Sequence, residues 1–397
     1  MAYEYANGVL GIRRNERFLP LSDVVKGHGE AVYVYSSDDV LNRIDWYKKA
    51  FARPVKIHFA MKANPFLPLL QIMARQKIGA DVVSGGELER ALEAGIAAEA
   101  IVFSGVGKSA AELKRALDCG IGQINIESLP ELERLAELSR GQKARVRVGL
   151  RLNPDVRPDT HHHITTGHRE NKFGLNLEHL REAVAILRTN EEHLKFYGLA
   201  MHVGSQILNT TTVIEAVRLI RRVFEDLRKE GWPLQSLDIG GGLGIDYTRT
   251  DAQGDLNRLQ SYAANVEVAL KGLDCDLLVE PGRFLVARSG VLLTQIEYVK
   301  QTPHRNFVIL NSGMNHLMRP ALYQAEHRIV PLFESKGRTL ICDIVGPICE
   351  STDVLGRQRS LPAPRSGDWL AVLDTGAYGY SMANQYNLRS LPVQILL

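Results

Sequence analysis

The sequence predicts a (β/α)8 barrel followed by a mostly antiparallel β domain, and three patterns indicate this fold. Eight short apolar runs are spaced along residues 55–279, and amphipathic stretches with helical periodicity separate most of them. After Arg283 the pattern changes to strand-like pieces without long helices between them. Alternating strands and helices form parallel sheets, and eight such units close into a barrel. An open, doubly wound sheet is the alternative.

The eight apolar runs are the predicted barrel strands. Between them, apolar residues recur three or four positions apart, as in Val213, Val217 and Ile220, which is the spacing of one helix face. In chain order the predicted strands are Val55–Met61, Ala80–Val83, Ile101–Ser104, Gln123–Ile126, Val146–Leu152, Tyr197–Val203, Leu237–Ile239 and Leu277–Val279.

The last part of the chain predicts a separate β domain. Turn residues such as Pro303 and Gly337 separate its strand-like pieces. We expect the barrel to span residues 30–284 and the β domain residues 285–397, with residues 1–29 joining the β domain. The predicted strands are Ser289–Lys300, Asn306–Leu310, Thr339–Val345, Asp368–Leu373 and Leu391–Leu397.

Composition excludes several classes of protein. The chain has 397 residues and a net charge of +3 from 48 basic and 45 acidic residues, and the two signs are interspersed, which argues against a nucleic-acid surface. No run of about 18 apolar residues predicts a membrane span, and the start of the chain lacks an apolar export signal. Four widely spaced cysteines suit a reducing compartment. We therefore expect a cytoplasmic protein.

Reactive residues recur at the ends of the predicted strands. Lys62 follows the first strand, Asp81 lies in the second and His202 ends the sixth. Gly240–Gly242 follows the seventh strand, and Glu280 follows the eighth. In barrels the active site lies at the carboxyl ends of the strands, and closure makes the eighth and first strands neighbours. We therefore expect Glu280 and Lys62 to lie at the same mouth.

Two of these features suggest a carbonyl cofactor that carries a phosphate. A lysine with its ordinary pKa of about 10.4 is protonated and inert, but a half-buried amine near other cations becomes a nucleophile. An ordinary surface lysine is the alternative for Lys62. The loops after strands seven and eight of a barrel commonly bind phosphate through backbone N–H groups, although Gly240, Gly241 and Gly242 could also form a simple tight turn.

Three patterns resemble nucleotide or metal motifs but do not predict such a site. Gly105–Ser109 resembles a P-loop, but the required glycine at position 102 is Val102. Gly240 and Gly242 begin a dinucleotide fingerprint whose third glycine is replaced by Ile245. His161–His163 lack nearby acidic or cysteine ligands, so we expect a solvated loop there and no metal site.

Ten segments together resemble the diaminopimelate decarboxylase family of fold-type III pyridoxal-phosphate enzymes. The resemblance spans nearly the whole chain and implies pyridoxal 5'-phosphate as cofactor, with a barrel and a β domain. The segments are Phe59–Asn64, Gly79–Glu87, Phe103–Ser109, Glu170–Gly174, His202–Gln206, Asp238–Gly242, Glu280–Arg283, Met314–Tyr323, Gly346–Ser351 and Gly376–Gly379.

The resemblance assigns the cofactor residues by position. It implies that Lys62 binds the cofactor covalently, that Glu280 partners the pyridine nitrogen and that His202 stacks on the ring. A carboxylate beside that nitrogen favours the protonated pyridinium, which is the electron sink for the reaction. The further implied cofactor contacts are Asp81, Ser205, Gly240, Gly241, Gly242, Gly282 and Tyr378.

The resemblance also assigns the substrate residues. It implies that Arg283, Arg319 and Tyr323, with Tyr378 nearby, hold a substrate carboxylate, because a guanidinium binds a carboxylate bidentately. Glu350 would take the distal amine and Cys349 would donate a proton, both from the opposite subunit of a homodimer. The implied reaction is decarboxylation of meso-2,6-diaminopimelate to L-lysine, the last step of lysine biosynthesis. The residues implied in catalysis are Lys62, Cys349, His202 and Glu280.

Departures from the family pattern keep alternatives open. His316 stands where the family commonly has aspartate, Asn311 and Ser312 replace Asp-Ala, and Leu388–Leu391 replaces a more polar, proline-rich tail. A decarboxylase of lysine, ornithine or a carrier-tethered glutamate is one alternative. A racemase on the same fold is a second, and a pyridoxal-phosphate carrier or inactive regulatory relative is a third. A lid around Thr160–Gly167 is undecided by the sequence.

Overall fold

The computed structural model describes residues 3–14, 17–142, 145–155, 172–249, 252–335 and 337–397, which form two compact units. The barrel unit consists of Asp45–Gly244 and Leu256–Gly282. The β unit consists of Met1–Ile44, Ile245–Asp255 and Arg283–Leu397. Each unit therefore draws on separate stretches of the chain.

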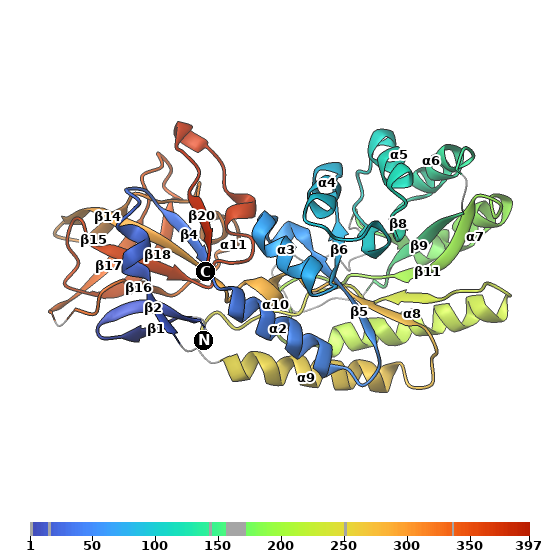
Figure 1. Cartoon of the computed structure of the whole chain (residues 1–397), viewed down its shortest axis with the longest axis horizontal. Helices are drawn as coiled ribbons and strands as arrows, with labels where there is room; N and C mark the ends of the chain where they lie inside the picture. Colours follow the sequence, from blue (N-terminus) through green and yellow to red (C-terminus); the bar gives the residue numbers. More distant parts are fainter. Residues whose placement is uncertain (1–2, 15–16, 143–144, 156–171, 250–251, 336) are drawn as a thin grey trace. The chain divides into compact units, whose positions relative to one another are not determined.

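Within the described residues of the barrel unit, eight parallel strands close into a barrel (Figure 1). Closure is complete because β8 pairs with β9, and β13 pairs with β5. The predicted closed barrel is confirmed, and each predicted run overlaps one strand. The strands are β5 (Val55–Ala60), β6 (Gly79–Val82), β7 (Ile101–Phe103), β8 (Gln123–Ile126), β9 (Val146–Asn153), β11 (Leu194–Ala200), β12 (Ser236–Asp238) and β13 (Asp276–Val279). The short β10 (Leu175–Asn176) adds to β9.

Local sequence signals set the ends of the helices. Ser109 and Glu112 form a capping box at the start of α5, and Gly120 ends that helix with φ 67°. Ser84 caps the start of α4 by accepting from the N–H of Glu87. The helices are α2 (Ser37–Ala50), α3 (Leu67–Arg75), α4 (Gly85–Glu93), α5 (Ala110–Cys119), α6 (Leu129–Ser139), α7 (Leu180–Thr189), α8 (Thr211–Lys229) and α9 (Ala252–Ala269).

The β unit contains two sheets. A small antiparallel sheet contains β1 (Tyr3–Ala6), β2 (Val9–Arg14) and β3 (Arg17–Pro20). The larger sheet is mostly antiparallel, with two parallel pairs, β15 with β17 and β4 with β20. Its strands are β4 (Val32–Tyr35), β14 (Gly290–Gln301), β15 (Asn306–Leu310), β16 (Ile329–Pro331), β17 (Thr339–Val345), β18 (Val354–Pro362), β19 (Trp369–Leu373) and β20 (Val393–Leu396). The short helices are α1 (Leu21–Val25), α10 (Arg283–Val286) and α11 (Arg319–Tyr323).

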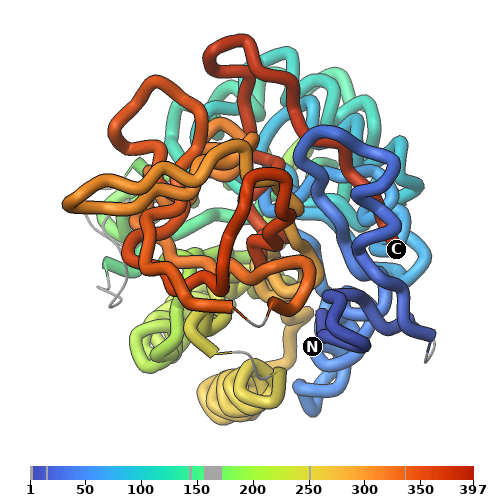
Figure 2. The backbone as a smooth tube through the Cα atoms, turned by 90° about the vertical axis from the view of Figure 1, so that its left-hand side faces the viewer, coloured from blue at the N-terminus to red at the C-terminus, as the bar shows by residue number. Residues whose placement is uncertain are grey.

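The two ends of the chain meet in the larger sheet. Strand β4 lies between β14 and β20, so the blue N-terminal and red C-terminal traces run side by side in Figure 2. One face of this sheet and the small sheet share an apolar core that includes Leu10, Ile12 and Val291. The β unit is therefore completed by strands from both ends of the sequence.

A buried ion-pair network joins the three stretches of the β unit. Asp255 Oδ2 lies 3.1 Å from Arg43 Nη2 and 3.0 Å from Arg288 Nε. Arg288 Nη1 also lies 3.2 Å from Asp374 Oδ2. Removing one partner of such a network leaves a buried charge uncompensated, at a cost of about 3–5 kcal/mol.

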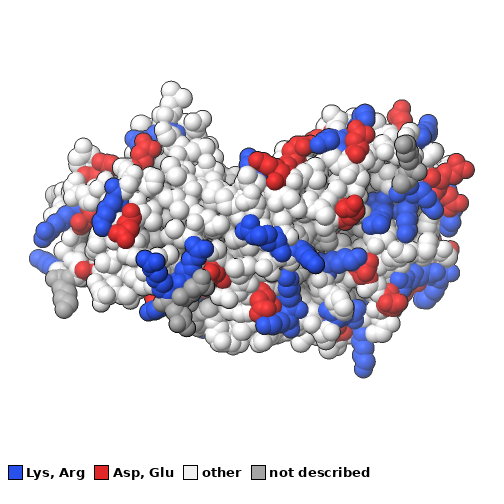
Figure 3. All heavy atoms as spheres, viewed as in Figure 1, with Lys and Arg blue, Asp and Glu red and all other residues white. Residues whose placement is uncertain are grey.

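Basic and acidic residues are interspersed on the molecular face in Figure 3. None of the helices described here is long and apolar enough to cross a membrane.

Candidate active site

Lys62 lies at the carboxyl end of the first barrel strand. It belongs to a single 3-10 turn, Met61–Ala63, that directly follows β5. Its Nζ lies 3.1 Å from Asp81 Oδ2; the Asp81 carboxylate is fully buried, whereas the lysine side chain is 39% exposed. Asp81 Oδ1 has no hydrogen-bond partner among the described residues. A buried carboxylate therefore holds an accessible amine at the end of the barrel.

Two further carboxyl groups, Asp238 and Glu280, interact near this amine. Burial raises the pKa of Asp238 to about 6, and Asp238 Oδ1 accepts from the Gly240 N–H at 2.8 Å. Burial, followed by the negative charges of Asp238 and Asp81, raises the pKa of Glu280 well above its usual value. A cation bound beside Glu280 would relieve this repulsion, so the cluster favours a positively charged group.

His202 contributes a neutral imidazole to the same end of the barrel. Its Nδ1 accepts from the Gly241 N–H at 3.2 Å, so the ring proton lies on Nε2. Burial, followed by the positive charges of Arg151 and Lys62, lowers the pKa of His202 well below its usual value. A Cβ atom on Gly241 would collide with the carbonyl oxygen of Glu280, which explains the glycine.

The glycine loops differ in which backbone N–H groups remain available to bind a phosphate. The N–H groups of Gly240 and Gly241 already donate to Asp238 and His202. The N–H groups of Gly242 and Gly282 have no partner in the part of the chain that the structure describes. Ser205 is half-buried in the loop after β11. Gly242 and Gly282 are thus the predicted phosphate contacts whose amides can still donate to an anion.

A second cluster, in the β unit, is built around buried arginines. Arg283 Nη1 donates to the Tyr247 hydroxyl at 3.0 Å, and its guanidinium lies 4.7 Å from the centre of the Tyr378 ring. The Arg319 guanidinium lies 4.4 Å from the centre of the Tyr247 ring. Both arginines are buried. Tyr323, at the end of α11, interacts electrostatically with both.

No acidic side chain among the described residues neutralises the charge of Arg319. Among the described residues it has no ion-pair partner, and its Nε makes no hydrogen bond. Burial lowers the pKa of Arg319, and the positive charge of Arg283 lowers it further. Two neighbouring buried cations of this kind form a receptor for an anion, and their planar groups suit a carboxylate. The predicted residues Arg283, Arg319 and Tyr378 are thus brought together.

Cys349 and Glu350 lie on a different loop of the β unit, after β17. The Cys349 thiol is exposed, and its backbone N–H donates to Asn387 Oδ1 at 3.2 Å. The Tyr386 hydroxyl donates to Glu350 Oε1 at 2.6 Å. Asp353 fixes the loop by accepting from the Ile348 N–H at 2.7 Å. The C-terminal segment therefore orients both predicted residues.

The three departures from the family pattern meet at His316. His316 Nε2 lies 2.9 Å from the carbonyl oxygen of Ser390, and its Nδ1 lies 3.0 Å from Ser312 Oγ. A carbonyl can only accept, so Nε2 donates and Nδ1 accepts. Both ring nitrogens are therefore used within the protein.

Several residues of these clusters were not predicted from the sequence. Asp238 lies within a segment that resembles the family, but its pairing with Glu280 depends on barrel closure. Tyr247 and His327 carry no local motif, and Tyr386 gives no signal without the loop of Glu350. The His161–His163 run and the possible lid at Thr160–Gly167 lie outside the described residues, among which no side-chain cluster is arranged to hold a metal.

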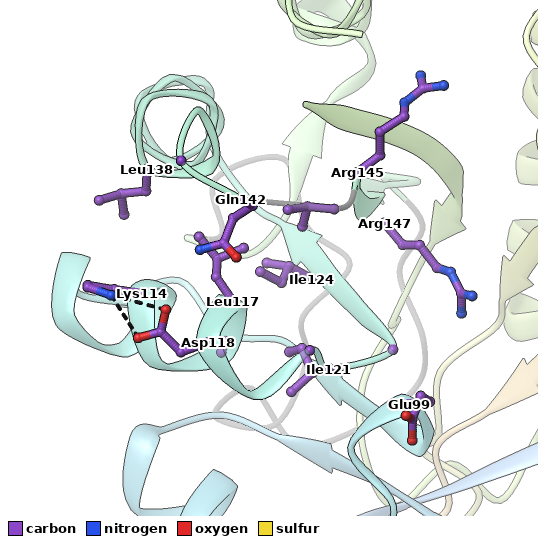
Figure 4. Close-up of a pocket in the computed structure, with 15 residues that line it drawn as sticks. Glu99, Lys114, Leu117, Asp118, Ile121, Ile124, Leu138, Gln142, Arg145 and Arg147 are labelled. Carbon is purple, nitrogen blue, oxygen red and sulfur yellow. Dashed lines mark hydrogen bonds and ion pairs between the residues drawn. The ribbon is translucent and has the colours of Figure 1, made fainter. Parts of the chain in front are cut away.

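The barrel unit also has a cavity of about 780 Å³ at the amino ends of β8 and β9 (Figure 4). Several of its polar side chains are paired within the protein: Lys114 bonds Asp118 at 2.7 Å, and Arg145 donates to the carbonyl oxygen of Leu194. Chemistry in barrels lies at the opposite, carboxyl ends of the strands. This cavity is therefore not the candidate site.

Sequence comparisons relate nearly the whole chain to one family of enzymes. Residues 37–287 match the family model of the pyridoxal-dependent decarboxylase pyridoxal-binding domain. The diaminopimelate decarboxylase of Zymomonas mobilis is 41% identical over 383 residues, covering 96% of this chain and 90% of the relative. That of Aquifex aeolicus is 37% identical over 394 residues, covering 99% and 92%.

Solved structures lead to the same family. The Helicobacter pylori diaminopimelate decarboxylase complexed with L-lysine has a TM-score of 0.90 at 38% identity, covering 95% of this chain and 93% of that one. The diaminopimelate decarboxylase from m. jannaschii in co-complex with L-lysine has a TM-score of 0.91 at 33% identity, covering 100% of this chain and 92% of that one. Pyridoxal phosphate fits the barrel residues, since Asp81 Oδ1 has no partner in the described part of the chain and the carboxyl cluster favours a cation. The chain belongs to the diaminopimelate decarboxylase family of pyridoxal-dependent decarboxylases.

Proposed function

We propose that this chain decarboxylates meso-2,6-diaminopimelate to L-lysine and CO₂, the last step of lysine biosynthesis. The observation that carries the proposal is the buried pair Arg283 and Arg319, with Arg319 lacking an acidic partner among the described residues. If the substrate had no second carboxylate, no group of the substrate would compensate the cost of burying these two positive charges. Diaminopimelate has a carboxylate at both ends, so one can be lost while the other is held.

The barrel residues would hold the cofactor. Lys62 would bind it covalently, with Asp81 orienting the amine, and Glu280 would lie beside the pyridine nitrogen. When bound, pyridoxal phosphate supplies the electron sink for the electrons left by CO₂. His202 would pack on the ring as a neutral group. The phosphate would be held by Ser205 and the glycine loops of Gly240–Gly242 and Gly282.

The β unit would select the substrate. Arg283, Arg319 and Tyr323, with Tyr378 nearby, would hold the distal carboxylate, and Glu350 would pair with the distal ammonium. The D-configured α-carbon loses CO₂ and receives a proton from the Cys349 thiol, which leaves L-lysine. Because the thiol is exposed, it can act in a partner subunit, so we propose a homodimer with shared active sites.

The His316 departure does not favour a different substrate. Its two ring nitrogens bond Ser390 and Ser312, so neither is left to contact an amino acid. We therefore prefer diaminopimelate to lysine, ornithine or a carrier-tethered glutamate. We also propose a cytoplasmic location, because all four cysteines are free thiols.

The direct test is incubation of the cofactor-loaded protein with meso-diaminopimelate, with CO₂ and lysine followed by mass spectrometry. D-Lysine, D-ornithine and L-ornithine serve as parallel substrates. We expect equal amounts of CO₂ and L-lysine from diaminopimelate alone. Unchanged diaminopimelate, with CO₂ released from another amino acid, would overturn the substrate. Exchange of the α-proton without CO₂ would indicate a racemase.

Hybrid dimers test the shared site. Cys349→Ala and Lys62→Ala proteins are each expected to be nearly inactive, while an equal mixture allowed to exchange subunits regains activity. Half of randomly paired dimers are hybrids with one intact site of two, so the mixture should reach about a quarter of the native activity. No recovery, with subunit exchange verified by mass, would contradict sharing.

A further inference from the structure

His327 lies between Arg319 and a backbone carbonyl in the β unit. Its Nε2 lies 2.7 Å from Arg319 Nη1, and its Nδ1 lies 2.9 Å from the carbonyl oxygen of Leu373. The imidazole is almost fully buried, and the edge of the Tyr247 ring packs on it at 5.2 Å between centroids. Both ring nitrogens therefore have a fixed partner.

The chemistry of these partners determines the tautomer of His327. A guanidinium can only donate, so Nε2 must accept from Arg319, and a carbonyl can only accept, so Nδ1 must carry the proton. The ring is consequently the neutral Nδ1–H form. Burial, and next the positive charge of Arg319, lowers the pKa of His327 well below its usual value, which agrees with a neutral ring.

The bond to His327 leaves a defined edge of Arg319 available. It uses Nη1, while the guanidinium carbon Cζ lies over the Tyr247 ring, 4.4 Å from its centre. Nε, on the other side, is buried and has no hydrogen-bond partner among the described residues. Nε and Nη2 together form the side-on edge that binds a carboxylate bidentately. The bond at Nη1 and the contact with the Tyr247 ring therefore hold this edge in position.

A neutral acceptor suits this task better than an acidic one. Aspartate or glutamate in place of His327 would pair with Arg319 and cancel the charge that attracts a substrate carboxylate. The imidazole fixes the same N–H group but leaves the positive charge unneutralised. It thereby orients the arginine without competing with the ligand.

We infer that His327 is a positioning residue for substrate selection: it orients the Nε–Nη2 edge of Arg319 toward the distal carboxylate of the substrate. This inference rests on the proposed function, because the carboxylate is that of diaminopimelate. Tyr247 supports the same arrangement from the face of the guanidinium and through its hydroxyl bond to Arg283.

Two amide variants each keep one of the two hydrogen bonds that the His327 ring makes. In His327→Gln the side-chain amide can reach the position of Nε2 and still accept from Arg319. In His327→Asn the amide can reach the position of Nδ1 and still donate to Leu373, but the acceptor for Arg319 is lost. We expect His327→Asn to raise KM for diaminopimelate about 10-fold with kcat within about twofold, and His327→Gln to change KM by less than about threefold. The reverse order would overturn the inference.

Inhibition by two matched ligands shows whether the carboxylate is what His327 affects. L-Lysine and 1,5-diaminopentane differ only by one carboxylate. In His327→Asn we expect inhibition by L-lysine to weaken about 10-fold and inhibition by diaminopentane to stay unchanged. Equal weakening of both would indicate a general structural role and overturn the inference.

A spectroscopic measurement tests the ring itself, independently of activity. Protein labelled with ¹⁵N-histidine, with His327→Gln used for assignment, should show His327 as the neutral Nδ1–H tautomer between pH 6 and 8. An Nε2–H or a protonated ring would refute the inference even if diaminopimelate were decarboxylated. Conversely, no CO₂ from diaminopimelate with the native protein would refute the proposed function and leave the ring assignment intact.

Discussion

The carboxyl cluster of the barrel unit and the arginine cluster of the β unit are opposite solutions to binding a charged ligand. In the barrel, Asp81, Asp238 and Glu280 gather around one lysine, and burial with mutual repulsion raises the pKa of Glu280. In the β unit, two arginines are buried among tyrosines and a neutral histidine. Each cluster carries an excess of one sign, which a ligand of the other sign can balance. Because like charges buried together destabilise the folded protein, both clusters indicate sites that bind a ligand rather than sites that stabilise the fold.

The largest expected effect is loss of the barrel amine. Lys62→Ala should lower kcat by on the order of 10⁴-fold and abolish the visible absorbance of the bound cofactor, because no nucleophile remains to hold it. Absorbance spectra and CO₂ release measure both changes. Lys56→Ala is the matched control, since Lys56 lies on β5, the strand that leads to Lys62, and pairs at the surface with Asp276. A fully active Lys62→Ala protein would refute the assignment.

The second prediction concerns the negative charge of the carboxyl cluster in the barrel. Glu280→Gln removes the carboxylate that favours a cation but keeps the side-chain shape, so we expect kcat to fall about 100-fold. Stopped-flow measurement of turnover with saturating cofactor separates this loss from weaker cofactor binding. An unchanged kcat would mean that the raised pKa of Glu280 reflects burial alone and serves no ligand.

The third prediction tests the arginine cluster. Arg319→Lys keeps the charge but loses the planar fork, so KM for diaminopimelate should rise about 10- to 100-fold with a smaller change in kcat. Steady-state kinetics measure the split. Arg357→Lys, at an exposed position in the same unit, is the control. If both variants had the native KM, the arginine cluster would not bind the carboxylate.

The smallest expected effect is on stability as a function of pH. Burial raises the pKa of Glu87 from 4.5 to about 7, so the folded protein keeps a proton that the unfolded chain releases earlier. This contribution to stability is fully present below pH 4.5 and is lost as the pH rises through about 7. The free energy of unfolding of Glu87→Gln should therefore fall less than that of the native protein as the pH rises from 4.5 to about 7. Urea unfolding at pH 5 and pH 8 measures the difference, and parallel curves would contradict it.

The barrel could be predicted because its information is local. Each strand is a short apolar run with a helix pattern after it, and the rule that active sites lie at carboxyl ends of strands identified Lys62 and Glu280. The edge strands of the β unit were harder to predict. In β18 apolar and polar residues alternate only weakly, and the strand is defined by its pairing with β17. Strand β4 is apolar, but its partners β14 and β20 lie more than 250 residues away in sequence.

The arginine cluster shows what a sequence pattern lacks. Arg283 and Arg319 were identified by resemblance, whereas Tyr247 and His327 depend on tertiary contacts that have no fixed spacing. Tyr247 belongs to the short stretch Ile245–Asp255, which leaves the barrel unit and joins the β unit. The role of His327 depends on a carbonyl in β19, at Leu373. Such roles follow from geometry alone.

The pairing of β4 with β20 also has a consequence for how the chain is made. Residues 45–282 supply every strand of the barrel, so that unit can close while the ribosome is still adding the remainder. Strand β4 is synthesised early, yet one of its edges has no partner until residues 393–396 emerge. During that interval an apolar strand edge is exposed, which is the condition under which chaperones bind nascent chains and neighbouring chains aggregate. Strand β4 therefore gains its second neighbour only when β20 has been synthesised, and protection of that edge depends on a strand of four residues.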